Sequence, residues 1–200
     1  METLDKKNIN DEKYWDAFYG RTETEPLRQT RLFFYRNVVK YLHKKGRKTL
    51  LEIGCGTGHG LNYLSTVNKN YKYIGFDLSA EAIEAGKIKY PYLKLAQGDI
   101  LKHNIRRYYD DILIVQTLEH FYKPLELVDK LLNNCHRLII SVPFEKCLSN
   151  GKAHMSTGFT KKGFAGYKVL AHEIVARKKR KKFLYIILMG IGEKYRELFG

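Results

Sequence analysis

Residues 49–60 read TLLEIGCGTGHG, and this stretch constrains the fold more than any other part of the chain. The run Leu50–Ile53 suits a buried strand, whereas the glycines at 54, 56 and 58 prevent that strand from continuing. Glycine adopts positive φ angles freely and leaves space beside the backbone. The sequence therefore predicts a strand that ends in a tight turn, with a ligand lying against the turn.

Strand-like and helix-like segments alternate from residue 48 onward. Ser79 is the predicted N-cap of a helix that Pro91 ends, and another helix follows Pro124. Strands that alternate with helices predict βαβ units, and nearly continuous apolar strands such as DILIV suit a sheet covered on both faces. The strand-like runs are 48–54, 71–77, 92–98, 111–117 and 137–143.

The two ends of the chain are less regular. Residues 11–46 follow a helical apolar pattern that Gly46 is expected to end. Upstream, residues 12–20 (EKYWDAFYG) form a separate short amphipathic piece that ends at Gly20. Near the C-terminus, 166–176 and 182–190 are predicted to form a hairpin with a basic turn, followed by a short helix at 193–199; a helix over 164–176 is the alternative. The predicted fold class is α/β, doubly wound, with a mostly parallel seven-stranded sheet.

Length and composition favour a single soluble domain. A hydrophobic fraction of 44% indicates a globular chain, and no apolar run approaches the ~18 residues of a membrane span. The polar N-terminus lacks a secretory apolar core, so we expect a cytoplasmic protein. We divide the single domain 1–200 into a helical lid (1–46), a cofactor-binding core (48–145) and an acceptor-side segment with the hairpin (146–200).

The three cysteines and the net charge bear on compartment and partners. Cys55, Cys135 and Cys147 lack paired metal spacing and fit a reducing compartment, where we expect them to be buried or incidental. The chain has 36 Lys and Arg against 21 Asp and Glu, a formal charge of +15. Such a field attracts anions, so it indicates either a polyanionic partner or simple solubility.

The glycine pattern separates two families of nucleotide-binding folds. A dinucleotide fingerprint needs glycines at i, i+2 and i+5, and the last of these positions is His59. Here the glycines stand at i, i+2 and i+4, and Glu52 precedes them. Asp77 in YIGFD and Asp99 in AQGDI follow. With this pattern the sequence resembles the class I S-adenosylmethionine-dependent methyltransferases. The resemblance covers about residues 30–145 and includes the segment DILIVQTLEHF and the strand LIISVP.

The resemblance implies S-adenosyl-L-methionine as the cofactor and a role for each matching residue. Asp77 would accept hydrogen bonds from the ribose hydroxyls, Asp99 would accept from the adenine amine, and Ile100 would pack on the adenine ring. The residues expected to bind the cofactor are Glu52, Gly54, Cys55, Gly56, Gly58, Asp77, Leu78, Asp99, Ile100 and Gln116.

Two histidines are the candidate catalytic residues. His120 follows the fourth predicted strand and His154 follows the fifth, and either could remove a proton from the acceptor. In some relatives a Glu-x-x-Glu-His motif binds a divalent metal, but here Gln116 stands at the first position. Because a hard cation prefers oxygen ligands, we expect no metal and an activity that survives a chelator. Loss of activity with EDTA, restored by magnesium or manganese, would instead make Glu119, His120 and His154 the ligands.

The methyl acceptor is open to several interpretations. We expect a small or lipid-like acceptor, because no RNA-binding module or basic–aromatic stacking platform accompanies the charge. An RNA methyltransferase, or a non-catalytic nucleotide or nucleic-acid binding module with the same fold, is the alternative. The basic run 177–182 fits a solvated turn, a contact for a polyanion or a peripheral membrane anchor beside the apolar 183–189.

Overall fold

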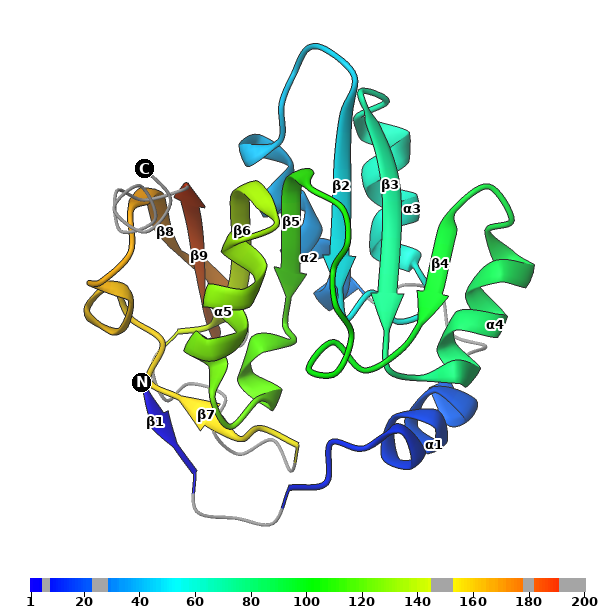
Figure 1. Cartoon of the computed structure of the whole chain (residues 1–200), viewed down its shortest axis with the longest axis horizontal. Coiled ribbons are helices and arrows are strands. Elements are labelled where there is room, and N and C mark those ends of the chain that lie inside the picture. The colour runs from blue at the N-terminus through cyan, green and yellow to red at the C-terminus, as the bar shows by residue number, and fades with distance from the viewer. Residues whose placement is uncertain (5–7, 23–28, 145–152, 178–181, 191–200) are drawn as a thin grey trace. The chain divides into compact units, whose positions relative to one another are not determined.

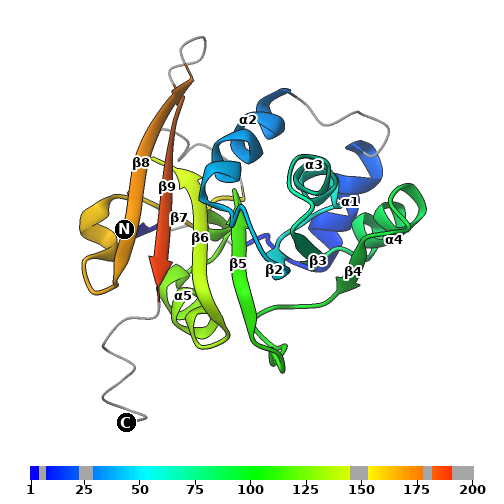
Figure 2. The same cartoon turned by 90° about the horizontal axis from the view of Figure 1, so that it is seen from above.

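The computed structural model describes residues 1–4, 8–22, 29–144, 153–177 and 182–190. The chain divides into two compact units, Lys7–Arg106 and Met1–Lys6 with Arg107–Gly200. Both combine strands with helices, as Figures 1 and 2 show. No helix within the described residues has the length and apolar character that a membrane span requires.

The unit Lys7–Arg106 is built on three parallel strands in the order β4–β3–β2. The strands are β2 (Lys48–Ile53), β3 (Tyr71–Asp77) and β4 (Lys94–Gln97). The helices are α1 (Glu12–Thr22), α2 (Gln29–Val38), η1 (Val39–Tyr41), α3 (His59–Val67) and α4 (Ala80–Lys89). Helix α3 packs on β3 and against α2, while α4 packs on β3, β4 and α1. In Figure 1 the arrowheads of β2 and β3 point toward the end at which α1 lies.

The local signals in this unit act as the sequence predicts. Leu61 and Leu64 of α3 are fully buried, and the preceding residue Gly58 has the left-handed conformation expected after the glycine turn. Ser79 caps α4, because its hydroxyl accepts a hydrogen bond from the backbone N–H of Ala82 at 3.1 Å. The cap satisfies one of the N–H groups that a helix leaves without a partner at its start.

The other unit contains four strands in the order β5–β6–β9–β8. They are β5 (Tyr109–Val115), β6 (Cys135–Pro143), β8 (Val169–Arg177) and β9 (Lys182–Gly190), with β5 and β6 parallel and the other neighbours antiparallel. Its helices are η2 (Leu118–His120), α5 (Pro124–Leu132) and η3 (Lys161–Phe164). A further pair of two-residue strands, β1 (Glu2–Thr3) and β7 (Ser156–Thr157), is antiparallel.

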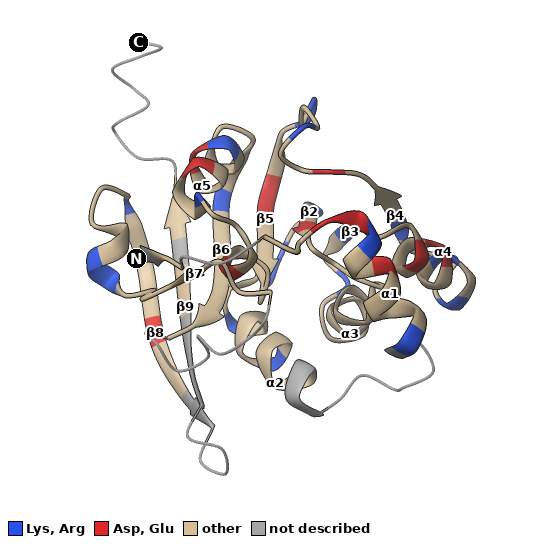
Figure 3. Ribbon diagram, turned by 90° about the horizontal axis from the view of Figure 1, so that it is seen from below, with Lys and Arg blue, Asp and Glu red and all other residues tan. Residues whose placement is uncertain are grey.

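Both the mixed α/β class and the C-terminal hairpin are confirmed. Strands β8 and β9 pair in antiparallel register up to Arg177 and Lys182, so the alternative of a helix over 164–176 is wrong. The basic turn at 178–181, the predicted helix at 193–199 and Cys147 lie outside the described residues. Figure 3 shows the described Lys and Arg on several separate elements, among them α4 in one unit and α5 in the other.

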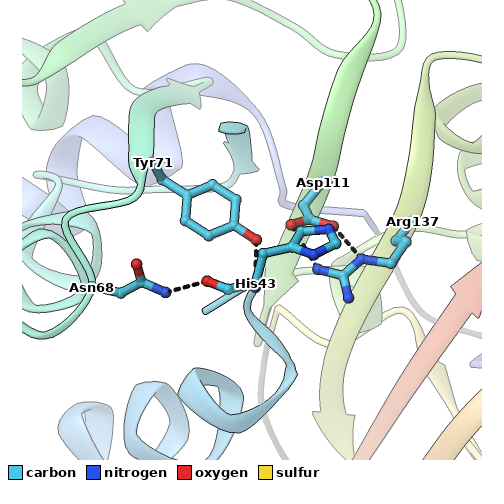
Figure 4. Close-up of polar contacts among 5 residues, drawn as sticks. All are labelled: His43, Asn68, Tyr71, Asp111 and Arg137. Carbon is cyan, nitrogen blue, oxygen red and sulfur yellow. Dashed lines mark hydrogen bonds and ion pairs between the residues drawn. The ribbon is translucent and has the colours of Figure 1, made fainter. Parts of the chain in front are cut away.

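Polar contacts hold each unit internally, and Figure 4 shows one set from each. Asp111 and Arg137 face each other across β5 and β6, with two bonds of 2.6 and 2.8 Å from the guanidinium to the carboxylate. In the other unit, the backbone N–H of His43 donates to the Tyr71 hydroxyl at 2.8 Å, and the Asn68 amide donates to the His43 carbonyl at 2.9 Å.

The N-terminal helical region ends earlier than the sequence predicts. The chain leaves the helical conformation at Leu42, whereas the expected end was Gly46. Leu42 is buried, and the bonds of His43 to Tyr71 and Asn68 hold the chain in a new direction. These contacts come from residues distant in sequence, which the local helical pattern does not reveal. Gly46 has a φ of +77° in the turn that leads into β2.

Candidate functional site

The turn after β2 is the first part of the site. Gly54, Gly56 and Gly58 have φ values of +75°, +54° and +77°, which other L-residues rarely adopt. The backbone N–H of Gly54 donates to the Phe76 carbonyl at 2.8 Å, which ties the turn to β3. The chain therefore makes the sharp turn after β2 that the glycines predict.

Asp77 lies at the end of β3 beside this turn. It is buried, and its two carboxylate oxygens accept bonds from the backbone N–H groups of Gly56 at 2.7 Å and Ser79 at 2.9 Å. Burial raises the pKa of Asp77, and hydrogen bonds from the backbone N–H groups of Ser79, Gly56 and Leu78 oppose the rise. A carboxylate has about four acceptor sites, so these backbone donors leave capacity for a further donor.

Glu52 precedes the turn on β2 and is fully buried. Its Oε1 accepts a bond of 2.6 Å from the Tyr35 hydroxyl, and its Oε2 has no hydrogen-bond partner among the described residues. Burial raises the pKa of Glu52 to about 8, with the Tyr35 bond acting against the rise and Asp77 adding to it. Glu52 is therefore largely protonated at neutral pH in this state.

Helix α1 covers the glycine turn through aromatic and acidic side chains. A Cβ built on Gly56 would lie 2.5 Å from the Tyr19 hydroxyl, so Tyr19 occupies the space that this glycine leaves. The carboxylate of Asp16 accepts bonds from the Ser79 hydroxyl at 2.6 Å and from the Glu81 N–H at 3.2 Å. Figure 3 shows acidic residues on both α1 and α4 in this unit. Helix α1, which contains the amphipathic piece 12–20, thus lies against the turn.

Asp99 and Ile100, the residues expected to contact adenine, follow β4. The carboxylate of Asp99 accepts a bond from the Leu101 N–H at 2.9 Å and forms a partly exposed ion pair with Lys102 at 3.3 Å. Ile100 is buried, and the carbonyl of Leu78 accepts a bond from the Gln97 amide at 3.1 Å. These contacts hold the Asp99–Ile100 turn in shape.

Cys55 differs from its neighbours in the turn. It is buried, and its sulfur packs against β3, where a Cβ on Gly75 would lie 2.6 Å from it. Burial raises the pKa of the Cys55 thiol well above its usual value, and the thiolate is the reactive form. Cys55 is therefore suited to packing, and any contact it makes with a ligand would come from its backbone.

Gln116, the first candidate residue of the other unit, directly follows β5. It has a φ of +52°, a conformation that a non-glycine side chain rarely adopts. Its backbone N–H and its side-chain amide both donate to the Ser141 carbonyl, at 2.8 and 3.2 Å. Strained backbone of this kind is common at functional sites.

Glu119, His120 and His154 form a cluster in the same unit. One ligand atom from each lies within 4.8 Å of the others, and the two imidazole rings meet edge to face with centroids 5.1 Å apart. Glu119 is buried, and burial raises its pKa to about 8. The structure therefore brings together both predicted catalytic histidines and adds a carboxyl group to them.

Several contact residues were missed by sequence reasoning. Tyr35 and Tyr19 reach the glycine turn from α2 and α1, at sequence distances that local patterns do not cover. A signal for Tyr35 existed in the additional glycine at position 60, because a Cβ there would overlap the Tyr35 ring. Asp16, which bonds to the cap of α4, had no comparable signal.

Comparison with protein families gives a consistent result. Residues 51–140 match a family model described as a methyltransferase domain. The tRNA N(3)-methylcytidine methyltransferase trm140 of Schizosaccharomyces pombe is 35% identical over 81 residues, which are 38% of this chain and 26% of that protein. The (S)-tetrahydroprotoberberine N-methyltransferase of Eschscholzia californica is 34% identical over 94 residues, which are 44% of this chain and 27% of that protein.

Solved structures show how far the likeness extends. The N-methyltransferase NodS from Bradyrhizobium japonicum, in complex with S-adenosyl-L-homocysteine, has a TM-score of 0.72 at 13% identity, covering 88% of this chain and 97% of that one. At this identity the likeness concerns the fold. The chain spans between 26% and 35% of the length of the curated relatives that it matches.

Proposed function

Because this chain belongs to the class I S-adenosylmethionine-dependent methyltransferases, we propose that it transfers a methyl group from S-adenosyl-L-methionine to an acceptor. The observation that carries the proposal is the buried Asp77 carboxylate, which is bonded to the N–H of Gly56 in the glycine turn and retains capacity for a further donor. A ribose hydroxyl is such a donor.

The residues of the unit Lys7–Arg106 would hold the cofactor. Asp77 accepts from the ribose, the glycine turn allows close approach, and Asp99 with Ile100 receives the adenine. Glu52 lies beneath the turn and, bonded to Tyr35, supports its shape. Tyr19 lies against Gly56, so we propose that α1 shields the bound cofactor from water.

The chemistry demands mainly correct positioning. S-adenosyl-L-methionine supplies a methyl group that is already activated on a sulfonium. Holding an acceptor at attack distance can remove about 7–11 kcal/mol of a barrier. A protein base is needed only where the acceptor must lose a proton. We propose His120 and His154 for this step, because the imidazole rings of these two residues, one in η2 and one just before β7, lie with their centroids 5.1 Å apart.

We propose a small or lipid-like acceptor. The similarity to the (S)-tetrahydroprotoberberine N-methyltransferase of Eschscholzia californica supports it, as does the lack of an evident RNA-binding module in the sequence. RNA is the second candidate, favoured by the formal charge of +15 and by the relationship to a tRNA methyltransferase.

The two acceptor classes are separated by salt dependence. Affinity for a single strand of nucleic acid falls with salt at a slope of about −0.7 per phosphate neutralised. We would titrate bulk tRNA and anionic liposomes at two salt concentrations, using the wild-type chain and a variant with serine at 178–182. Tight, salt-steep tRNA binding that the variant loses would favour RNA. Weak tRNA binding, together with methylation in a screen of small molecules, would favour the first candidate.

Cofactor binding is the direct test of the proposal. We expect Asp77→Ala to weaken binding of S-adenosyl-L-methionine more than tenfold in calorimetry, because ribose hydroxyls would be left unpaired. Glu84→Ala, an exposed carboxylate on α4 that pairs with Lys87, is the matched control. Asp77→Asn preserves the shape of the residue, and circular dichroism verifies that each variant folds. Equal affinity of the wild type and folded Asp77 variants would refute the assignment.

Methyl transfer separates an enzyme from a binding module. A labelled cofactor incubated with a panel of acceptors should yield a labelled product and S-adenosyl-L-homocysteine. A chain that binds the cofactor tightly and transfers no label to any acceptor in the panel would favour the non-catalytic alternative.

A further inference from the structure

The cluster of Glu119, His120 and His154 is held in place by backbone contacts. Glu119 and His120 belong to η2, and His154 lies two residues before β7. The N–H of Met155 donates to the Glu119 carbonyl at 2.8 Å, and the Ser156 hydroxyl donates to a carbonyl just after η2 at 2.5 Å. These bonds join the two segments on either side of the cluster, so the three side chains are brought together by the fold.

A hydrogen bond sets the orientation of His120. Its Nδ1 lies 2.9 Å from the carbonyl oxygen of Ala153. A carbonyl oxygen can only accept, so Nδ1 carries the hydrogen and the lone pair of the neutral ring is on Nε2. Metal-binding histidines characteristically donate their other ring N–H to a carbonyl or carboxylate in this way.

Glu119 supplies an independent observation. Its side chain is 2% exposed, and Oε2 has no hydrogen-bond partner among the described residues. A buried carboxylate oxygen without a partner is destabilising, because it has lost its hydration without a replacement. A cation bound by the cluster would supply the missing interaction.

We propose that Glu119, His120 and His154 bind a divalent transition-metal cation of the zinc class. Two imidazoles and one carboxylate suit borderline ions such as Zn²⁺ or Co²⁺, whereas Mg²⁺ and Ca²⁺ take oxygen ligands. Three protein ligands leave at least one coordination position for water or for a donor atom of another molecule. Ligand atoms within 4.8 Å of one another need only small side-chain adjustments to reach a common ion.

The expectation of no metal came from Gln116, and the structure shows what that residue does. Its side-chain NH2 group donates to the Ser141 carbonyl, and an amide brings no carboxylate charge to a site at Glu119. That argument concerns hard cations alone. His154 adds a second nitrogen donor beside His120, so the cluster offers two nitrogens and one carboxylate oxygen. The two imidazole rings lie with their centroids 5.1 Å apart.

The metal site and the proton-acceptor role compete for the same imidazoles. A ring nitrogen bound to a cation cannot accept a proton from an acceptor molecule. With the ion present, the vacant coordination position would receive the acceptor instead. The metal site does not require the proposed methyl transfer, because ion binding is measured without S-adenosyl-L-methionine.

The experiment is a cobalt titration of the metal-stripped chain. We expect one equivalent of Co²⁺ to give the visible absorption of a low-symmetry site, and Zn²⁺ to displace it. Glu119→Gln and His154→Gln should each weaken Co²⁺ binding at least 100-fold. His136→Gln, which alters an exposed histidine at the start of β6, should leave Co²⁺ binding unchanged.

Folding is verified for every variant by circular dichroism, and Glu119→Gln serves if His154→Gln does not fold. Absence of the cobalt absorption in the folded wild type would overturn the proposal. Equal Co²⁺ affinity in the wild type and the folded cluster variants would also overturn it. A chain that binds Co²⁺ as expected but not S-adenosyl-L-methionine would refute the methyl-transfer proposal and leave the metal site standing.

Discussion

Replacing Glu52 by glutamine should change how the stability of the chain depends on pH. Glu52 is fully buried, one carboxyl oxygen accepts from Tyr35, and the other has no hydrogen-bond partner among the described residues. Burial raises its pKa from 4.5 to about 8. The folded protein therefore binds the Glu52 proton more tightly than the unfolded chain does.

The sign and the magnitude follow from this difference. The stabilisation linked to the Glu52 proton is fully present below pH 4.5 and is lost as the pH rises through about 8. Each tenfold change in proton affinity corresponds to about 1.4 kcal/mol, so the full loss is about 5 kcal/mol. Glutamine has a similar shape and no proton to lose, so Glu52→Gln should not show this decline.

Urea unfolding at a series of pH values measures the effect. Between pH 6 and pH 8 the free energy of unfolding of the wild type should fall by about 2–3 kcal/mol relative to Glu52→Gln. Glu126→Gln, at an exposed residue paired with Lys123, is the control and should run parallel to the wild type. Parallel curves for the wild type and Glu52→Gln would show that the buried carboxyl does not hold its proton as argued.

Two further substitutions test the turn and the second unit. Gly56→Ala should weaken cofactor binding and lower stability, because the φ of Gly56 is +54° and the new Cβ would lie 2.5 Å from the Tyr19 hydroxyl. Adding Tyr19→Phe should restore part of the stability in urea unfolding. A Gly56→Ala chain as stable as the wild type would contradict this reasoning. Arg137→Ala should destabilise by about 3–5 kcal/mol, because Asp111 is fully buried and loses both guanidinium bonds. Joint replacement of Asp111 and Arg137 by leucine and methionine should cost much less, and equal losses for the single and double variants would refute the ion-pair explanation.

Much of the fold could be predicted from local patterns. The strand 71–77 has the predicted bounds, and the capping of α4 by Ser79 occurs as expected. Both features depend on neighbours in sequence: an apolar run ended by a charged residue, and a hydroxyl three positions before an N–H. The hairpin was also predicted, although a helix fitted the same residues nearly as well. Pairing with β9 decided in favour of the strand.

The parts that escaped prediction depend on residues distant in sequence. The helix ends at Leu42 rather than at Gly46 because of contacts to Tyr71 and Asn68. The approach of His154 to His120 likewise requires β7 to lie beside η2, which no periodicity indicates. Residue types and spacing therefore identified Glu119, His120 and His154 as the alternative to the expectation of no metal, but they did not show that the three side chains lie together.

The family match and the acceptor chemistry concern different parts of the chain. The matched residues 51–140 contain the glycine turn, Asp77 and Asp99, which explains why the cofactor can be inferred from similarity. His154 and Tyr19 lie outside that span, and His154 belongs to the cluster with Glu119 and His120. One curated relative is named for a tRNA and another for (S)-tetrahydroprotoberberine, so similarity to these relatives does not determine the acceptor. The proposed cation at Glu119, His120 and His154 would select an acceptor with a donor atom able to coordinate it, so the cobalt titration would narrow the acceptor class in a way that further similarity within 51–140 would not.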